Sequence, residues 1–181
     1  MRRPPLTKTP QISRQAAALR RAFDRSFAEP NRPPLAKTTD LLAIRLGGDP
    51  WAVPLADIAG LHSGKRITPL PGGPSSLLGI AGFRGNVVAV YDLPALIGQA
   101  PLAAPRWLLV AAERRVAFAF GELDGHVRVE TKQLLPLGPE GGAAWAKGFV
   151  LTEEQHRPLL HLPALLAGIA QRSKTPEGSD L

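Results

Sequence analysis

Glycine and proline recur so closely along this chain that no long regular element fits between them. The 181 residues include 18 Gly and 19 Pro, together about a fifth of the chain. Glycine favours turns because it tolerates positive φ, and proline lacks the N–H that helices and inner strands need. This spacing excludes a bundle of long helices and predicts many short elements joined by turns. With 44% hydrophobic residues, the chain can still fill the core of an ordinary domain.

From residue 41 onward the apolar residues come in runs of strand length, so we expect an all-β fold. The predicted strands cover residues 41–46, 51–58, 67–71, 107–112, 116–120, 126–129, 148–151 and 158–162. Asp124-Gly125 is a typical turn pair and is expected to precede the strand at 126–129. Residues 163–171 predict a closing helix that begins at a proline. Two successive sets of strands predict two small barrels or one folded-over sheet.

The densest apolar stretch, residues 77–93, predicts a β-hairpin. Two apolar runs flank Arg84-Gly85-Asn86, where Gly85 supplies the positive φ of a tight turn. Directly after the second run, Asp92 can cap a short helical turn over residues 93–97.

Arg84 stands at the apex of this predicted hairpin, between two glycines at positions 82 and 85. An arginine on a stiff turn suits recognition, because its planar guanidinium matches a carboxylate. A polar residue that only keeps the turn solvated explains the pattern equally well.

The positive charge of the chain is concentrated at its N-terminus. Residues 1–40 hold nine Lys/Arg and three Asp/Glu, so they carry +6 of the formal net charge of +7. The remaining residues carry only +1. A nucleic-acid-binding body would need its own basic stripe with interleaved aromatic residues, and this pattern is missing. We therefore expect no nucleic-acid partner.

Residues 1–38 predict a basic, proline-rich tail that contains one amphipathic helix. Ser13 can cap a helix over residues 14–28, which prolines end. One face of that helix is apolar and carries Ile12, Ala16, Leu19, Phe23 and Phe27. The helix either packs on its own domain or docks on a membrane surface or an acidic partner. The tail lacks the apolar stretch of a secretory signal, and no run in the chain reaches membrane-spanning length.

The motifs of catalysis and metal binding are mostly missing from this sequence. There is no Cys, which excludes disulfides, thiolate metal sites and a cysteine nucleophile. The four histidines lie outside metal-binding spacings, and no phosphate loop or nucleophile elbow occurs. Glu122 and Asp124 are a weak candidate for an acid/base pair, and solvent exposure explains them equally well. We expect no cofactor, no metal and no enzymatic activity.

The order of motifs over residues 40–171 resembles the CheW family of chemotaxis adaptors. The resemblance rests on a series that keeps its order and spacing: Leu41–Leu46, Trp51-Ala52-Val53-Pro54, Ile58, Thr68-Pro69-Leu70-Pro71, Pro74, Gly79-Ile80, Phe83-Arg84-Gly85, Val87–Val90, Asp92-Leu93, Leu123-Asp124-Gly125, Trp145 and Gly148. The resemblance implies two five-stranded β-barrels that share a core, followed by a C-terminal helix. It divides the chain into the tail at 1–38, a CheW-like domain at 39–172 and a polar tail at 173–181.

The resemblance also implies a non-catalytic adaptor in bacterial signal transduction. Such an adaptor couples the tips of methyl-accepting chemoreceptors to the regulatory domain of a CheA-type histidine kinase. It is expected in the cytoplasm, near receptor arrays, and meets the membrane only through its receptors. The partner-binding residues carried over are Ile58 and Gly60 for the kinase contact, Gly79, Phe83, Arg84 and Gly85 in the hairpin region, and Leu108 and Leu109 for the receptor contact.

Two departures from the family pattern bear on partner binding. An acidic residue is common in the family at the position of Gly60, and its loss here removes a charge from the expected kinase contact. The Asn-Leu that precedes Arg-Gly in the family is Gly82-Phe83 in this chain. An alternative function is a divergent scaffold whose basic N-terminal helix recruits a pole, membrane or pilus-signalling component.

Overall fold

The computed structural model describes residues 37–137, 145–151 and 155–172, all within one compact unit. The helix expected over residues 14–28 and the polar tail at 173–181 lie outside the described residues. No helix in these three ranges is long and apolar enough to cross a membrane.

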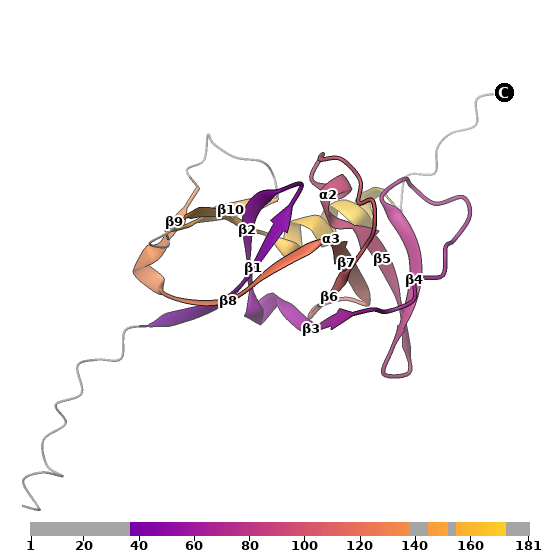
Figure 1. Cartoon of the computed structure of the whole chain (residues 1–181), viewed down its shortest axis with the longest axis horizontal. Helices are drawn as coiled ribbons and strands as arrows, with labels where there is room; N and C mark the ends of the chain where they lie inside the picture. Colours follow the sequence, from indigo (N-terminus) through magenta and orange to yellow (C-terminus); the bar gives the residue numbers. More distant parts are fainter. Residues whose placement is uncertain (1–36, 138–144, 152–154, 173–181) are drawn as a thin grey trace, which may run out of the picture. The chain divides into compact units, whose positions relative to one another are not determined.

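Strands dominate the described residues, which confirms the all-β prediction (Figure 1). The strands are β1 (Thr38–Leu46), β2 (Asp49–Pro54), β3 (Ile58–Ser63), β4 (Leu77–Phe83), β5 (Asn86–Asp92), β6 (Trp107–Ala111), β7 (Val116–Phe120), β8 (Glu122–Glu130), β9 (Leu134–Pro136), β10 (Ala146–Leu151) and β11 (His156–Leu160). The helices are α2 (Leu93–Leu96), α3 (Leu162–Arg172) and two 3-10 turns, η1 (Leu55–Asp57) and η2 (Thr131–Gln133). The predicted closing helix at 163–171 is α3, one residue longer at each end.

The strands form one sheet of six, in the order β8-β1-β2-β11-β10-β9, and one of five, in the order β3-β6-β7-β5-β4. In each sheet the two edge strands are consecutive in the chain. Edge strands β8 and β9 are joined by η2, and the segment after β3 reaches β4 through a bridge between Thr68 and Ile80. The continuous chain therefore connects the two edges of each sheet, and Figure 1 shows β8 curving through η2 toward β9.

Three local predictions differ from the structure. The strand expected over 51–58 is two strands, because Pro54 ends β2 and η1 turns the chain into β3. The turn expected at Asp124-Gly125 is wrong, since both residues lie inside β8, which pairs with β1 over nearly its whole length. The strand expected at 67–71 contributes only the bridge of Thr68 to Ile80.

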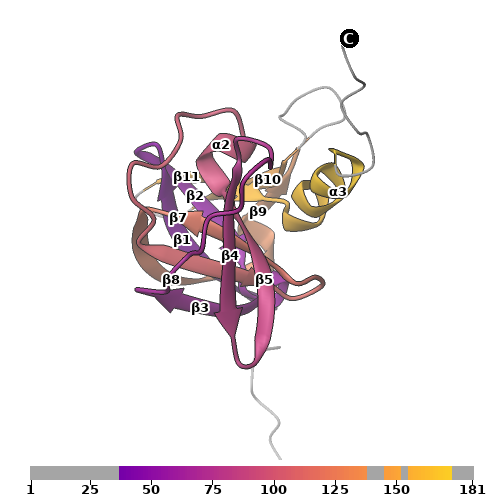
Figure 2. The same cartoon turned by 90° about the vertical axis from the view of Figure 1, so that its right-hand side faces the viewer.

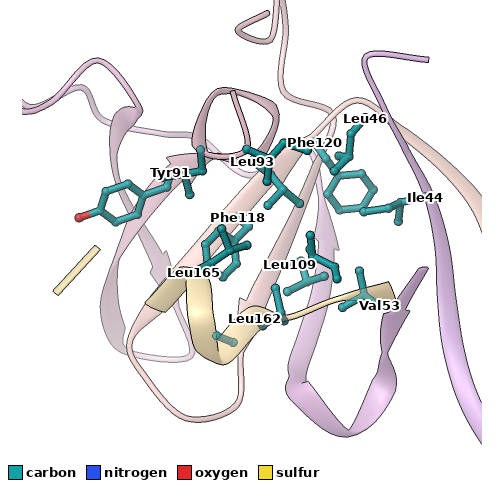
Figure 3. Close-up of a cluster of buried hydrophobic side chains, with 14 of the residues drawn as sticks. Ile44, Leu46, Val53, Tyr91, Leu93, Leu109, Phe118, Phe120, Leu162 and Leu165 are labelled. Carbon is teal, nitrogen blue, oxygen red and sulfur yellow. The ribbon is translucent and has the colours of Figure 1, made fainter. Parts of the chain in front are cut away.

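The buried side chains form three clusters because successive residues of a strand point to opposite faces. Leu41 packs in a cluster of the first sheet, while its neighbour Leu42 packs in a larger shared cluster. Likewise Leu108 belongs to a cluster of the second sheet and Leu109 to the shared one. The shared cluster draws residues from both sheets and from α3, and Figure 3 shows several of its side chains packed together. The two sheets therefore form one folded unit.

Ion pairs centred on Asp124 link three strands of the first sheet, β8, β1 and β11. The carboxylate of Asp124 in β8 accepts hydrogen bonds from Arg45 Nε at 3.0 Å and from Arg157 Nη2 at 2.7 Å. Arg157 comes from β11 and is only 9% exposed. Burial of Asp124 opposes its ionisation, but the hydrogen bonds from Arg157 and Arg45 outweigh that cost and lower its pKa. This carboxylate is engaged structurally, which argues against the acid/base role considered for it.

Candidate partner-binding groove

Three segments of the second sheet surround a groove of about 410 Å³. β3 contributes Gly60 and His62, and the β4–β5 hairpin contributes Phe83 and Arg84. The turn between β6 and β7 contributes residues 113–115. Three of the predicted site residues, Gly60, Phe83 and Arg84, thus line one surface feature. The groove is therefore the candidate functional site.

Arg84 lies at the apex of the hairpin in an unusual backbone conformation. Phe83 pairs with Asn86, so Arg84 and Gly85 alone form the turn, with φ values of +46° and +79°. Positive φ at both central residues is the type I′ geometry that suits the twist of a hairpin. Arg84 is the one non-glycine residue with positive φ in the described part of the chain. A side chain costs about 1 kcal/mol in this region, so the fold holds Arg84 there at some expense.

The hairpin turn carries this arginine away from the sheet. In both views the β4–β5 turn projects beyond the neighbouring strands (Figure 2). Arg84 is exposed, and none of the ion pairs or side-chain hydrogen bonds between described residues involves its guanidinium. Its five N–H donors are available to an acceptor outside the chain.

A ring contact joins the β3 side of the groove to the β4–β5 hairpin. The His62 ring packs against the Phe83 ring, with centroids 4.7 Å apart and planes inclined at 53°. Lys65 Nζ lies 5.7 Å from the centroid of Phe83, within reach of a cation–π contact. A Cβ at Gly60 would lie 2.9 Å from His62 Nε2. The missing side chain at position 60 therefore leaves room that the imidazole occupies.

The remaining predicted site residues lie outside the lining of this groove. Gly85 is exposed in the hairpin turn, and Ile58 is half-buried at the start of β3 against the shared cluster. Gly79 packs directly against the backbone of the segment at Thr68. Leu108 and Leu109 are 3% and 0% exposed, so their side chains belong to the core and face no partner.

Sequence reasoning missed the most strongly charged side of the groove. Glu113, Arg114 and Arg115 are all exposed in the turn between β6 and β7. The sequence predicts this turn, but which hairpin it faces depends on β7 pairing in parallel with β5. That pairing is long-range and carries no local signal. A cluster of three charged residues in one turn was the available hint.

A second hollow of about 670 Å³ lies between the loop at 72–77 and α3. Tyr91, Leu96 and Ile169 line its apolar side. Burial raises the pKa of Tyr91 above its usual value. None of the predicted site residues lines this hollow. Within the described ranges there is also no cluster of His, Asp and Glu that could hold a metal ion.

The geometry is that of a protein-interaction domain: a packed β core that presents a charged groove and a projecting hairpin. The model of the CheW-like domain matches residues 40–170 of the chain. The chain therefore belongs to the CheW-like domain family, whose members are non-catalytic scaffold and adaptor proteins. The resemblance seen in the sequence motifs is confirmed.

Two individual proteins support the assignment. The chain is 23% identical over 135 residues to a probable chemotaxis protein CheW of Rhizobium etli, and the match covers 71% of this chain and 87% of the relative. The fold is similar to the crystal structure of the scaffolding protein TtCheW from Thermoanaerobacter tengcongensis, with a TM-score of 0.62 and 15% identity. That similarity covers 67% of this chain and 88% of the solved chain.

Proposed function

We propose that this chain is an adaptor that couples chemoreceptors to a CheA-type histidine kinase in a cytoplasmic receptor array. The observation that carries the proposal is Arg84, which a two-residue turn holds at positive φ beside the groove. Strained residues persist where the surrounding structure over-determines them and are enriched at functional sites. Membership of the CheW-like family supports the adaptor class.

The surface assigned to partner contact is the groove together with the hairpin turn. Gly60, Phe83 and Arg84 line the groove, and Gly85 shapes the turn. The buried Leu108 and Leu109 act on any contact through the position of β6, since their side chains are in the core. Gly79 likewise supports the position of β4, since it packs against the backbone of Thr68. Ile58 is half-buried at the start of β3, next to the groove residues of that strand.

The experiment is a direct binding titration of the full chain. The partners are the regulatory domain of the cognate kinase and a fragment of the cognate receptor tip. Arg84→Glu is expected to weaken at least one of the two complexes by tenfold or more, on the order of 1.4 kcal/mol, while its melting temperature stays close to that of the wild type. Arg106→Glu, an exposed arginine outside the groove lining, is the matched control. A wild-type chain that binds neither partner would refute the proposal.

A second candidate function rests on the charge distribution. Residues 1–40 carry +6 of the formal net charge of +7, so the positive charge is concentrated in one segment. This segment suits recruitment of an acidic protein or an anionic membrane surface. A variant that begins at residue 39 should then bind the kinase domain like the full chain but lose its cellular position. Unchanged localisation would exclude the recruiting role.

A further inference from the structure

The groove combines a basic rim with an apolar floor. Arg84, Arg114 and Arg115 are exposed at its rim, and Glu113 is the one acidic residue among the lining residues that the structure describes. Phe83 and Val88, both buried, form part of its lining between these charges. The groove therefore offers cationic donors beside apolar side chains.

The three arginines of the rim form no ion pair with another described residue. The ion pairs between described residues engage Asp40, Asp57, Asp124 and Glu130, and none involves Arg84, Arg114 or Arg115. Glu113 is the single carboxylate of the lining, and Gly60 on the β3 wall carries no side chain. The three arginine charges exceed the one negative charge of Glu113, so a ligand can neutralise the remaining positive charge.

We infer that this groove binds an acidic protein segment in which carboxylates flank an apolar side chain. Arginine is the cation best matched to carboxylates, because its planar fork donates two parallel hydrogen bonds. The apolar floor then takes the side chain between the carboxylates. This inference rests on the proposed function, in which the segment belongs to the partner of the adaptor.

A protein segment fits these observations better than a nucleic acid. Binding of a phosphate backbone needs a long basic track, and residues 41–181 carry a net charge of only +1. The basic residues gather at one groove of limited size, about 410 Å³. That volume suits one anchoring side chain with its charged neighbours.

The inference can be tested without knowing the partner. The probe is a labelled peptide in which glutamates flank a leucine, compared with the same peptide carrying glutamines, both titrated against the full chain by fluorescence anisotropy. The glutamate peptide should bind at least about tenfold more tightly, and added salt should weaken it strongly. The double variant Arg114→Glu/Arg115→Glu should abolish the preference, whereas Arg106→Glu should retain it. Equal affinity for the two peptides, or an equal effect of the control, overturns the inference.

One further variant and one further probe test whether the groove is basic and whether it prefers protein over other anions. Gly60→Asp places a carboxylate beside His62 and should weaken the glutamate peptide several-fold, so tighter binding contradicts a basic groove. A single-stranded DNA oligonucleotide that binds as tightly as the peptide would show a general anion site and also overturn the inference. Failure of the kinase and receptor to bind while the peptide preference holds would refute only the proposed function. If the kinase and receptor bind but the glutamate peptide has no advantage, only the inference of an acidic segment is refuted.

Discussion

Gly79 lies in direct contact with the backbone of Thr68. A Cβ built on Gly79 would be 2.1 Å from the carbonyl oxygen of Thr68, far inside van der Waals contact. The two segments are held there by the hydrogen bonds from Thr68 N to Ile80 O at 2.8 Å and from Ile80 N to Thr68 O at 2.9 Å. The glycine thus allows the chain that follows β3 to reach the edge of β4. A position expected to bind a partner has a structural role in the fold.

Gly79→Ala should destabilise the protein substantially. The new methyl group would collide with a backbone atom, and the φ of +140° at this position is unfavourable for any L residue with a side chain. We expect a loss of at least about 2 kcal/mol in the free energy of unfolding. Gly82→Ala in the same strand is the control, since nothing lies within 4 Å of its Cβ position. Similar urea midpoints for the two variants would contradict the close contact.

Arg84→Asn should stabilise the fold and weaken partner binding. Asparagine tolerates positive φ better than arginine, and Asn-Gly is the preferred pair of a type I′ turn. The free energy of unfolding should rise by about 0.5 kcal/mol or more, since the turn strain falls. Binding to the partner should fall because the guanidinium is lost. Thermal melts measure the change in stability, and titrations measure the change in partner affinity. A variant that loses stability as well as affinity would argue against strain at this turn.

Asp92→Ala should cost far more stability than an exposed aspartate does. Asp92 is 1% exposed, and its carboxylate accepts hydrogen bonds from Ala95 N at 3.0 Å and Leu102 N at 2.8 Å. Its removal leaves two N–H groups without partners, for an expected loss of about 2–4 kcal/mol. Asp49→Ala removes one exposed hydrogen bond to Gln99 and should cost less than about 1 kcal/mol. Chemical denaturation of both variants measures the difference.

Asp124→Asn should destabilise the protein at neutral pH and much less in acid. Loss of the carboxylate leaves the nearly buried Arg157 without its counter-charge, at a cost of about 2 kcal/mol. Because the folded pKa of Asp124 lies below the ordinary value of 3.8, the wild-type ion pair stabilises fully above that value. Its contribution is lost as the pH falls through the folded pKa. The difference in melting temperature between the wild type and the variant should therefore be smaller at pH 3 than at pH 7, and a difference that stays constant would exclude this linkage.

Local signals predicted the elements that short-range chemistry determines. The Arg84-Gly85 turn, the cap at Asp92 and the helix α3 follow from residues within a few positions of each other. The interior of a hairpin needs little more than two apolar runs and a turn pair. These features were predictable because no distant contact competes with them.

Long-range pairing decided what the sequence left open. Asp124-Gly125 favours a turn locally, but pairing of β8 with β1 holds both residues in a strand, with an irregularity at Ala43 and Ile44. In the same way, the approach of Arg114 and Arg115 to Arg84 depends on the parallel contact of β5 and β7. The individual residues of the groove were partly predictable, but its charge was not.

The shared cluster has a mechanical consequence. Side chains from both sheets interlock with Leu162 and Leu165 of α3 in one close-packed interior, and such interiors resist deformation much as organic crystals do. Two ligands bound on opposite sheets would therefore stand at a fixed angle and spacing, with no hinge between them. Such a domain would fix the relative position of its two ligands and would not transmit a conformational change between them. In a larger protein assembly this domain would act as a rigid spacer, and any conformational change would have to occur in the proteins bound to it.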